Sequence, residues 1–371
     1  MDHPDTRYEE LAVPGVRALH PYTPGKPIAE LEREYGIRNA VKLASNENPL
    51  GPPPAAIAAA QQELAGLARY PEGSGNLLTA ALAEKHAVPA EAITLGNGSN
   101  DVLDMVARVF LGPGGEAVFS RHAFAVYPIV VQAVGARARL AAAQARTCGH
   151  DLDAMVELVG SETRVVFIAN PNNPTGTWLA EQELHRFVAD LPEHVIVVID
   201  EAYFEYVEQP DYPDTSRWLA EFPNLVVTRT FSKAYGLAGL RVGYAVSAPG
   251  IADLLNRVRH PFNVNSVAQA AAVAALNDSV HLEAVLQLNR DGMQQLETGF
   301  KMLGLSWIPS VGNFVTMDTG QDATAVYERL LQLGVIVRPV ANYGLPEYLR
   351  VTVGLPEENE RFLSAIARAL A

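Results

Sequence analysis

The sequence has a single cysteine and a shortage of basic residues, and each of these excludes a class of protein. Because Cys148 has no second cysteine to pair with, the chain cannot form an internal disulfide framework, which favours a reducing, cytoplasmic compartment. Lysine and arginine number 28 against 42 aspartate and glutamate residues, giving a formal net charge of −14. Such a chain repels nucleic acid and anionic lipid on average, so we expect neither as a partner.

The sequence also lacks a long apolar run. Its least charged stretch, residues 260–277, is interrupted by Pro261 and by several amide side chains, which argues against a membrane span. Acidic residues such as Glu9 and Glu10 interrupt any apolar run near Met1, so we expect no secretory signal. What the chain does have is 49% hydrophobic and 19% charged residues, the balance of a globular protein. Its 371 residues favour two domains over one small core.

In the middle of the chain, short apolar strands alternate with helical patterns. The expected strands are residues 93–95, 117–119, 165–169, 195–199, 226–229 and 242–246. Strands that are apolar throughout are buried on both faces, and helices between them imply parallel crossover connections. We therefore predict an α/β domain with a mostly parallel sheet, in which ligands bind at the carboxyl ends of the strands.

The flanking regions follow other patterns. The first 54 residues are rich in proline and glycine and predict an irregular arm with one helix at 28–35. The next helix is expected to carry Ile57, Leu64 and Leu67 on one face. After Ser266, two helices, three strands and a last helix beyond Pro356 predict a smaller α+β domain.

We accordingly divide the chain into three regions. Residues 1–54 form the arm and part of the small domain, residues 55–264 form the large domain, and residues 265–371 form the rest of the small domain.

Lys233 lies just beyond the predicted strand 226–229, where a side chain faces the ligand cleft of such a sheet. Its ammonium has a reference pKa of about 10.4, so it can act as a nucleophile only after burial or conversion to an imine removes the charge. Alone, a lysine on a loop would more often be a surface residue. The polar residues at the neighbouring strand ends favour a chemical role instead.

Asp200 and Asn173 follow two of these strands. A buried carboxylate needs a cationic partner, and a pyridinium nitrogen is one such partner, although an aspartate here could also simply cap a helix. Asn173 lies in a segment whose prolines and asparagines predict a tight loop. Its amide could hold a phenolate oxygen.

A glycine turn at residues 96–98 connects the strand 93–95 to the next helix. Free backbone N–H groups at a helix start bind phosphate, although a turn of this kind alone usually means only a connection. The turn is neither a Walker loop nor a Rossmann fingerprint. With Ser232 and Arg241 as further donors, a phosphate site is plausible.

Seven motifs run in the same order as in one enzyme family. They are residues 42–49 (KLASNENP), 70–73 (YPEG), 96–101 (GNGSND), 170–176 (NPNNPTG), 200–203 (DEAY), 230–241 (TFSKAYGLAGLR) and 349–354 (LRVTVG). With them the chain resembles the fold-type I pyridoxal-phosphate-dependent aminotransferases, and within that family the histidinol-phosphate aminotransferases. The resemblance covers nearly the whole chain, and the motifs at 170–176 and 230–241 are the specific ones.

The resemblance implies roles around the cofactor ring. Lys233 would carry pyridoxal 5'-phosphate as a Schiff base and, once released, move the proton between substrate and cofactor carbons. Asp200 would pair with the pyridine nitrogen, and Asn173 and Tyr203 would hold the ring hydroxyl oxygen. Phe124 stands where many relatives have a stacking tyrosine, so stacking is kept but a hydroxyl is lost.

It also implies a phosphate site shared between subunits. Ser99, Asn100, Ser232 and Arg241 would hold the cofactor phosphate, although relatives often have an acidic residue where this chain has Asn100. Tyr70 would reach the phosphate in the neighbouring subunit, which makes a homodimer part of the site.

Arg350 and Thr352 alternate with aliphatic residues in the strand 349–353, so they lie on its opposite face. A strand arginine of this kind is commonly an exposed edge charge. The resemblance implies instead that Arg350 binds the substrate carboxylate or phosphate bidentately, that Arg338 is the second contact to a substrate phosphate, and that Tyr22 lies nearby.

The implied reaction is a ping-pong transamination between histidinol phosphate and 2-oxoglutarate, giving imidazole acetol phosphate and glutamate. The nearest alternative is an aromatic amino acid aminotransferase on the same scaffold. A pyridoxal-phosphate-dependent phosphothreonine decarboxylase and a catalytically silent cofactor-binding protein are further alternatives. We expect no metal.

Overall fold

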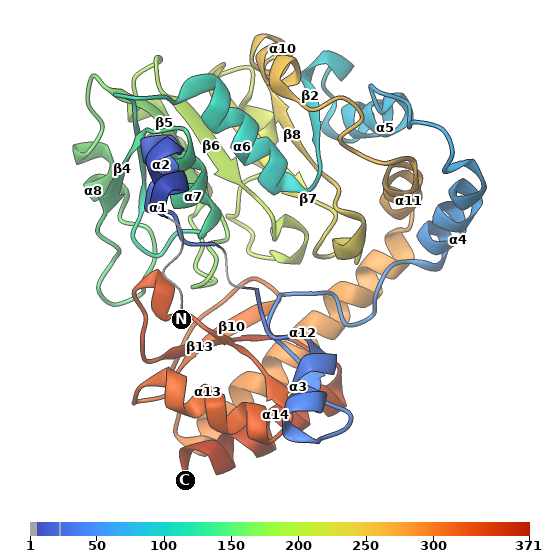
Figure 1. The fold of residues 1–371 in the computed structure, drawn as a ribbon, viewed down its shortest axis with the longest axis vertical. Helices are drawn as coiled ribbons and strands as arrows, with labels where there is room; N and C mark the ends of the chain where they lie inside the picture. The colour runs from blue at the N-terminus through green and yellow to red at the C-terminus, as the bar shows by residue number, and fades with distance from the viewer. Residues whose placement is uncertain (1–5, 22–23) are drawn as a thin grey trace.

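The computed structural model describes residues 6–21 and 24–371, and Figure 1 shows two layered bodies, one above the other. The upper body contains a seven-stranded sheet in the order β2-β8-β7-β6-β5-β3-β4. Its strands are β2 (Ile93–Gly96), β3 (Glu116–Ser120), β4 (Arg137–Ala141), β5 (Thr163–Ala169), β6 (Ile196–Asp200), β7 (Leu225–Thr230) and β8 (Gly243–Ser247). Only β8 runs antiparallel to its neighbours, so the predicted mostly parallel sheet is confirmed.

Alternate side chains of the central strands enter two separate cores. On β5, Val165 and Phe167 pack with α6 (Ser99–Phe110), α7 (Val126–Ala133) and α10 (Pro249–Val258), whereas Val166 and Ile168 pack with α8 (Leu152–Glu157) and α9 (Glu181–Asp190). This burial on both faces explains the uninterrupted apolar runs. The edge strand β4 was not predicted, because four of its five residues are exposed and it has no such run.

The lower body contains a four-stranded sheet in the order β12-β13-β10-β9, covered by α12, α13 and α14. Its elements are β9 (Trp307–Ile308), β10 (Phe314–Asp318), β12 (Arg338–Pro339), β13 (Tyr348–Thr352), α12 (Ser279–Leu303), α13 (Ala323–Gln332) and α14 (Pro356–Leu370).

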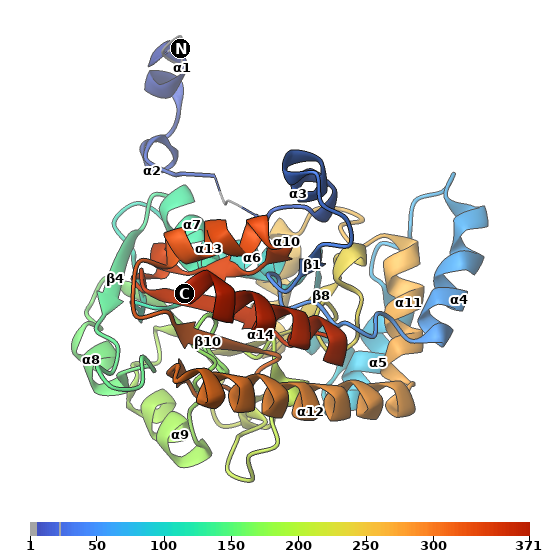
Figure 2. The same cartoon turned by 90° about the horizontal axis from the view of Figure 1, so that it is seen from below.

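The N-terminal arm joins this lower body. Its strand β1 (Val41–Lys42) pairs in parallel with β11 (Val335–Ile336), and its helix α3 (Ile28–Tyr35) contributes Leu31 to the core beside it. The first helices, α1 (Thr6–Leu11) and α2 (Pro14–Arg17), project beyond the rest of the molecule, with α2 touching α7 (Figure 2).

The packing of α11 (Ser266–Leu276) bears on the domain limits. Alanines of α11 share a core with Ala56 of α4 (Pro54–Glu63) and with α5 (Asn76–His86), which belong to the upper body. The domain limits given above stay a prediction. Because α11 packs with the upper body, we propose that the boundary between the large domain and the C-terminal part of the small domain lies within α12, whose later residues Leu296 and Phe300 enter the lower core.

The apolar residues expected on one face of the helix α4 are largely exposed in this chain. The helix ends at Glu63, and Ile57, Leu64 and Leu67 are 44%, 53% and 62% exposed. Small alanines make the contact with α11 instead. None of the described helices is both long and apolar enough to cross a membrane.

Candidate active site

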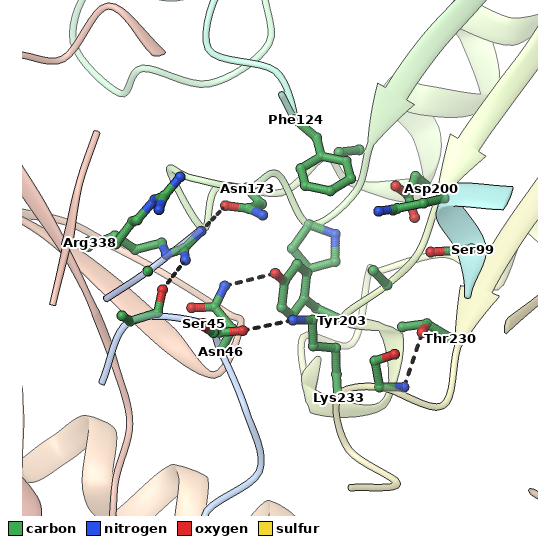
Figure 3. Close-up of a pocket in the computed structure, with 18 of the residues that line it drawn as sticks. Ser45, Asn46, Ser99, Phe124, Asn173, Asp200, Tyr203, Thr230, Lys233 and Arg338 are labelled. Atoms are coloured by element: carbon green, nitrogen blue, oxygen red, sulfur yellow. Dashed lines mark hydrogen bonds between the residues drawn. The ribbon is translucent and has the colours of Figure 1, made fainter. Parts of the chain in front are cut away.

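The carboxyl ends of β5, β6 and β7 face β12, β13 and the arm across one cavity. Its empty space is about 890 Å³, including the part open to solvent. It is lined by these sequence-predicted residues: Ser99, Asn100, Phe124, Asn173, Asp200, Tyr203, Ser232, Lys233, Arg241, Arg338 and Arg350. Tyr22 lies outside the described residues, and Tyr70 is not in the lining. Figure 3 shows Phe124, Asn173, Asp200 and Lys233 around one central space.

Lys233 is held in the cavity by the arm. Its Nζ donates a hydrogen bond to the carbonyl oxygen of Ser45 at 3.0 Å (Figure 3). Burial lowers the pKa of Lys233 to about 7, with a further contribution from the nearby guanidinium of Arg350. Near neutral pH a large share of the amine is therefore uncharged and able to act as a nucleophile or base.

Asp200 ends β6 and is only 4% exposed. Burial raises its pKa to about 6, against the opposing effect of hydrogen bonds from Thr228 and Tyr127. Thr228 Oγ1 donates at 3.1 Å and Tyr127 Oη at 3.2 Å, one to each carboxylate oxygen. This buried carboxylate is positioned by two donors and suited to a cationic partner in the cavity.

Tyr203 is buried with its hydroxyl near the arm. Asn46 Nδ2 donates to the Tyr203 hydroxyl oxygen at 2.8 Å. Burial raises the pKa of Tyr203 to about 12, so the phenol stays protonated at neutral pH and can donate a hydrogen bond.

The start of α6 lies at the cavity, where the sequence predicted a phosphate site. The N-cap Gly98 offers no side-chain cap, and although the Asp101 N–H donates to the Gly98 carbonyl oxygen, the N–H groups at the very start of the helix suit an anion. Gly98 precedes it with φ 78°, and a Cβ there would clash with Arg241 Nη2. Arg241 also donates to Ser232 Oγ at 3.3 Å. Hydroxyl, guanidinium and backbone donors thus converge as a phosphate requires.

Two arginines form the opposite wall. Arg350 is 5% exposed and donates to Asn173 Oδ1 at 2.6 Å and to the carbonyl oxygen of Ala44 at 2.7 Å. Arg338, 9% exposed, lies opposite Arg350 in the register of β12 and β13. The alternative of an exposed edge charge at Arg350 is wrong, because β13 lies between β12 and β10 and its polar face borders the cavity.

Tyr70 lies on the surface, where it is 83% exposed and stacks on Phe262 with ring centroids 4.8 Å apart. It therefore does not reach the cavity of its own chain. Its predicted contact with a neighbouring subunit stays a prediction.

The model of the family "Aminotransferase class I and II" matches residues 38–366. The chain belongs to this family. It is 61% identical over 363 residues to "Histidinol-phosphate aminotransferase 2" of Pseudomonas fluorescens, covering 97% of this chain and 98% of that one. It is 60% identical over 364 residues to the enzyme of the same name from Methylococcus capsulatus, with 97% and 98% covered.

A solved relative agrees with the fold of this aminotransferase. The crystal structure of histidinol-phosphate aminotransferase from Sinorhizobium meliloti, in complex with pyridoxal-5'-phosphate, superposes with a TM-score of 0.89 at 30% identity and covers 96% of each chain. The predicted fold-type I class is thereby confirmed.

Asn46, Ala202 and Tyr127 are among the contributors to the aminotransferase site that were not assigned a role from sequence. Asn46 and Ala202 line the cavity, and Tyr127 contacts Asp200 from α7. Asn46 and Ala202 could have been identified from the sequence because they lie inside the motifs 42–49 and 200–203. Tyr127 lies in an apolar helix, where a core aromatic is the ordinary interpretation.

Proposed function

We propose that this aminotransferase uses pyridoxal 5'-phosphate at Lys233 to move an amino group between histidinol phosphate and a 2-oxo acid. The observation that supports this choice of substrate is the pair Arg338 and Arg350, which lie on one wall of the cavity that contains Lys233. Two guanidinium groups suit a substrate with a phosphate, and Arg338 lies across the cavity from Ser99, which would hold the cofactor phosphate (Figure 3). The names of the relatives support the same substrate.

The described residues fit the cofactor on every side. The uncapped start of α6, Ser232 and Arg241 suit its phosphate, and the buried Asp200 suits its ring nitrogen. Phe124 and Ala202 both line the cavity and could cover the ring faces. Bound there, the cofactor would act as an electron sink for the substrate carbon that carries the amino group.

Lys233 would move the proton. With a pKa lowered to about 7, its Nζ can accept a proton from the substrate carbon and return it without a large energetic cost. The negative carboxylate of Asp200 would stabilise a proton on the ring nitrogen, and burial strengthens this attraction because it excludes water.

Arg350 would bind the anion common to both partners of the reaction. The carboxylate of glutamate and the phosphate of histidinol phosphate each accept a bidentate guanidinium contact. Arg338 would add a second contact for the phosphate. The amino donor and the amino acceptor can thus occupy the same cavity in turn, as a ping-pong reaction requires.

We further propose a cytoplasmic homodimer in which Tyr70 reaches the partner's cavity. Ile57, Leu64, Leu67 and Tyr70 are all exposed and lie close together in the sequence around the end of α4. Exposed apolar residues of this size favour a protein interface. The single cysteine supports a reducing compartment.

The test is amine transfer from single donors to the cofactor-loaded protein. Histidinol phosphate, phenylalanine and glutamate would be compared in single turnovers, followed by absorbance. The proposal requires efficient transfer from histidinol phosphate and glutamate. A preference for phenylalanine would indicate the aromatic enzyme, carbon dioxide release without a keto acid would indicate a decarboxylase, and no transfer from any donor would indicate silent binding.

A further inference from the structure

Asn46 connects the small domain to the cavity, although no role followed for it from sequence. It is 1% exposed, lines the cavity and has φ 54°, in the left-handed region. Non-glycine residues seldom adopt this conformation, and asparagine is among the few that tolerate it. Such an arrangement persists only where surrounding contacts fix it.

The contacts of Asn46 fix the direction of each hydrogen bond. Its backbone N–H donates to Thr352 Oγ1 at 2.9 Å, so the Thr352 hydroxyl must give its own proton elsewhere. The acceptor is Asn46 Oδ1, at 3.2 Å. The side-chain amide is therefore oriented with its oxygen toward Thr352 and its Nδ2 toward Tyr203 (Figure 3).

This orientation determines what the Tyr203 hydroxyl can do. Because Nδ2 can only donate, the phenol oxygen is the acceptor in that bond, and the phenol proton is not used there. Within the described part of the chain, Tyr203 has no other side-chain hydrogen bond, and its side chain lines the cavity. Its O–H is left to donate to a group in the cavity.

We propose that Asn46 is a positioning residue that directs the Tyr203 O–H at the ring oxygen of the cofactor, with Thr352 holding the Asn46 amide in the required orientation. This inference rests on the proposed function, since it needs the cofactor in this cavity. Asn46 would affect the reaction only by orienting the Tyr203 hydroxyl.

The same contacts link substrate binding to the cofactor. Thr352 lies two residues after Arg350 on β13, and Asn313 Nδ2 binds the Asn46 carbonyl oxygen at 3.0 Å. The preceding carbonyl groups of the arm accept from Lys233 at Ser45 and from Arg350 at Ala44. A shift of the small domain that moves Arg350 and Thr352 would therefore also move the group that orients Tyr203.

Thr352→Val and Asn46→Asp test the proposal in different ways. Valine has nearly the shape of threonine but cannot hold the Asn46 amide, which is then free to rotate and accept from Tyr203. Aspartate keeps the shape of asparagine and tolerates the backbone, but its carboxylate can only accept, so the Tyr203 O–H would donate its hydrogen bond to residue 46 and not into the cavity. Thr352→Ser keeps the hydroxyl and is the matched control.

The readouts are the dissociation constant of pyridoxal 5'-phosphate and the pH midpoint of its visible absorbance when bound. Loss of a hydrogen bond to a charged oxygen should weaken cofactor binding about tenfold or more in both variants. The pH midpoint should rise by about one unit. A ring oxygen without this donor keeps more negative charge, which raises the pKa of the adjacent protonated Schiff-base nitrogen at Lys233. Thr352→Ser should match the parent, and the unfolding midpoints of the cofactor-free proteins control for stability.

The decisive comparison repeats both substitutions in a Tyr203→Phe background. If Asn46 acts through Tyr203, its effects on binding and on the pH midpoint disappear there, because coupled residues are not additive. Equal effects with and without the Tyr203 hydroxyl, or binding unchanged in Thr352→Val, would overturn the inference while leaving the proposed function intact. A parent protein that does not bind pyridoxal 5'-phosphate would overturn both.

Discussion

Arg338 and Arg350 are direct cross-strand partners on β12 and β13, so two guanidinium groups lie beside each other on the same cavity wall. Like charges directly opposite on a sheet are unfavourable on their own. Arg350 donates to the Asn173 amide oxygen and the Ala44 carbonyl oxygen, which hold its guanidinium at the cavity. This wall is therefore suited to an incoming anion.

Arg350→Ala should lower kcat/KM with every anionic donor. The lost charge-assisted contact is worth on the order of 1.5–3 kcal/mol, or about a ten- to hundredfold loss. The loss should appear with both glutamate and histidinol phosphate, measured after cofactor content and folding are checked. Arg217→Ala is the matched control, since that side chain is 82% exposed. An unchanged kcat/KM with all donors would remove Arg350 from the substrate site.

Arg338→Ala should discriminate between donors. Histidinol phosphate should lose more efficiency than phenylalanine, because only its phosphate needs a second arginine. The ratio of the two kcat/KM values is the measurement. Equal losses for all donors would contradict the phosphate contact and favour the aromatic aminotransferase.

Asp200→Asn should slow catalysis far more than it weakens cofactor retention. The phosphate cradle would still hold the cofactor, but the ring nitrogen would lose its charged partner and with it much of the ring's electron-sink character, which predicts a rate at least about a hundredfold lower. Tyr127→Phe is the graded control, since it removes one of the two side-chain donors to Asp200 and keeps the charge. Rates within a few-fold of the parent for Asp200→Asn would leave Asp200 a structural residue.

The sequence predicted the parts of the site that follow from strand patterns. The apolar runs of β5 and β6 locate the carboxyl ends of these strands, and Asn173 and Asp200 lie at those ends. The alternation of apolar and polar residues on β13 places Arg350 on the face opposite the core. Lys233 follows β7 in the same way. These positions depend on local periodicity, which the sequence states directly.

Contacts between distant segments could not be predicted in this way. Asn46 meets Tyr203 across 157 positions of the chain, and Tyr127 meets Asp200 across 73. The exposure of Ile57 was missed because helical spacing identifies an apolar face but not what covers it. Such features depend on how whole elements pack, and a surface that meets another subunit has the same pattern as one that meets the core.

The pH dependence of cofactor attachment should report Lys233. Because its pKa is lowered to about 7, the rate at which the cofactor-free protein takes up pyridoxal 5'-phosphate should rise with pH around a midpoint near 7. The unfolded chain binds more protons than the folded chain between that pKa and the ordinary lysine value of 10.5, so the stability of the cofactor-free protein should rise with pH across this window. Arg350→Gln removes a nearby positive charge and should move the midpoint upward, whereas Arg217→Gln should not. A midpoint near the ordinary lysine value in the parent would contradict the assignment.

Tyr70 should act across the subunit interface, which can be tested by mixing two defective variants. Lys233→Ala removes the amine and should abolish turnover, and Tyr70→Ala should weaken cofactor binding about tenfold or more through the lost phosphate contact. In a mixed dimer, the Tyr70→Ala subunit keeps its own Lys233 and would receive Tyr70 from its partner, so one site is complete. Random pairing makes half of the dimers mixed, so activity at limiting cofactor should recover to about a quarter of the parent value. Tyr70→Ala mixed with Lys233→Ala,Tyr70→Ala is the control that should show no recovery. If the first mixture forms mixed dimers but gains no activity over the control, Tyr70 does not serve the partner's site.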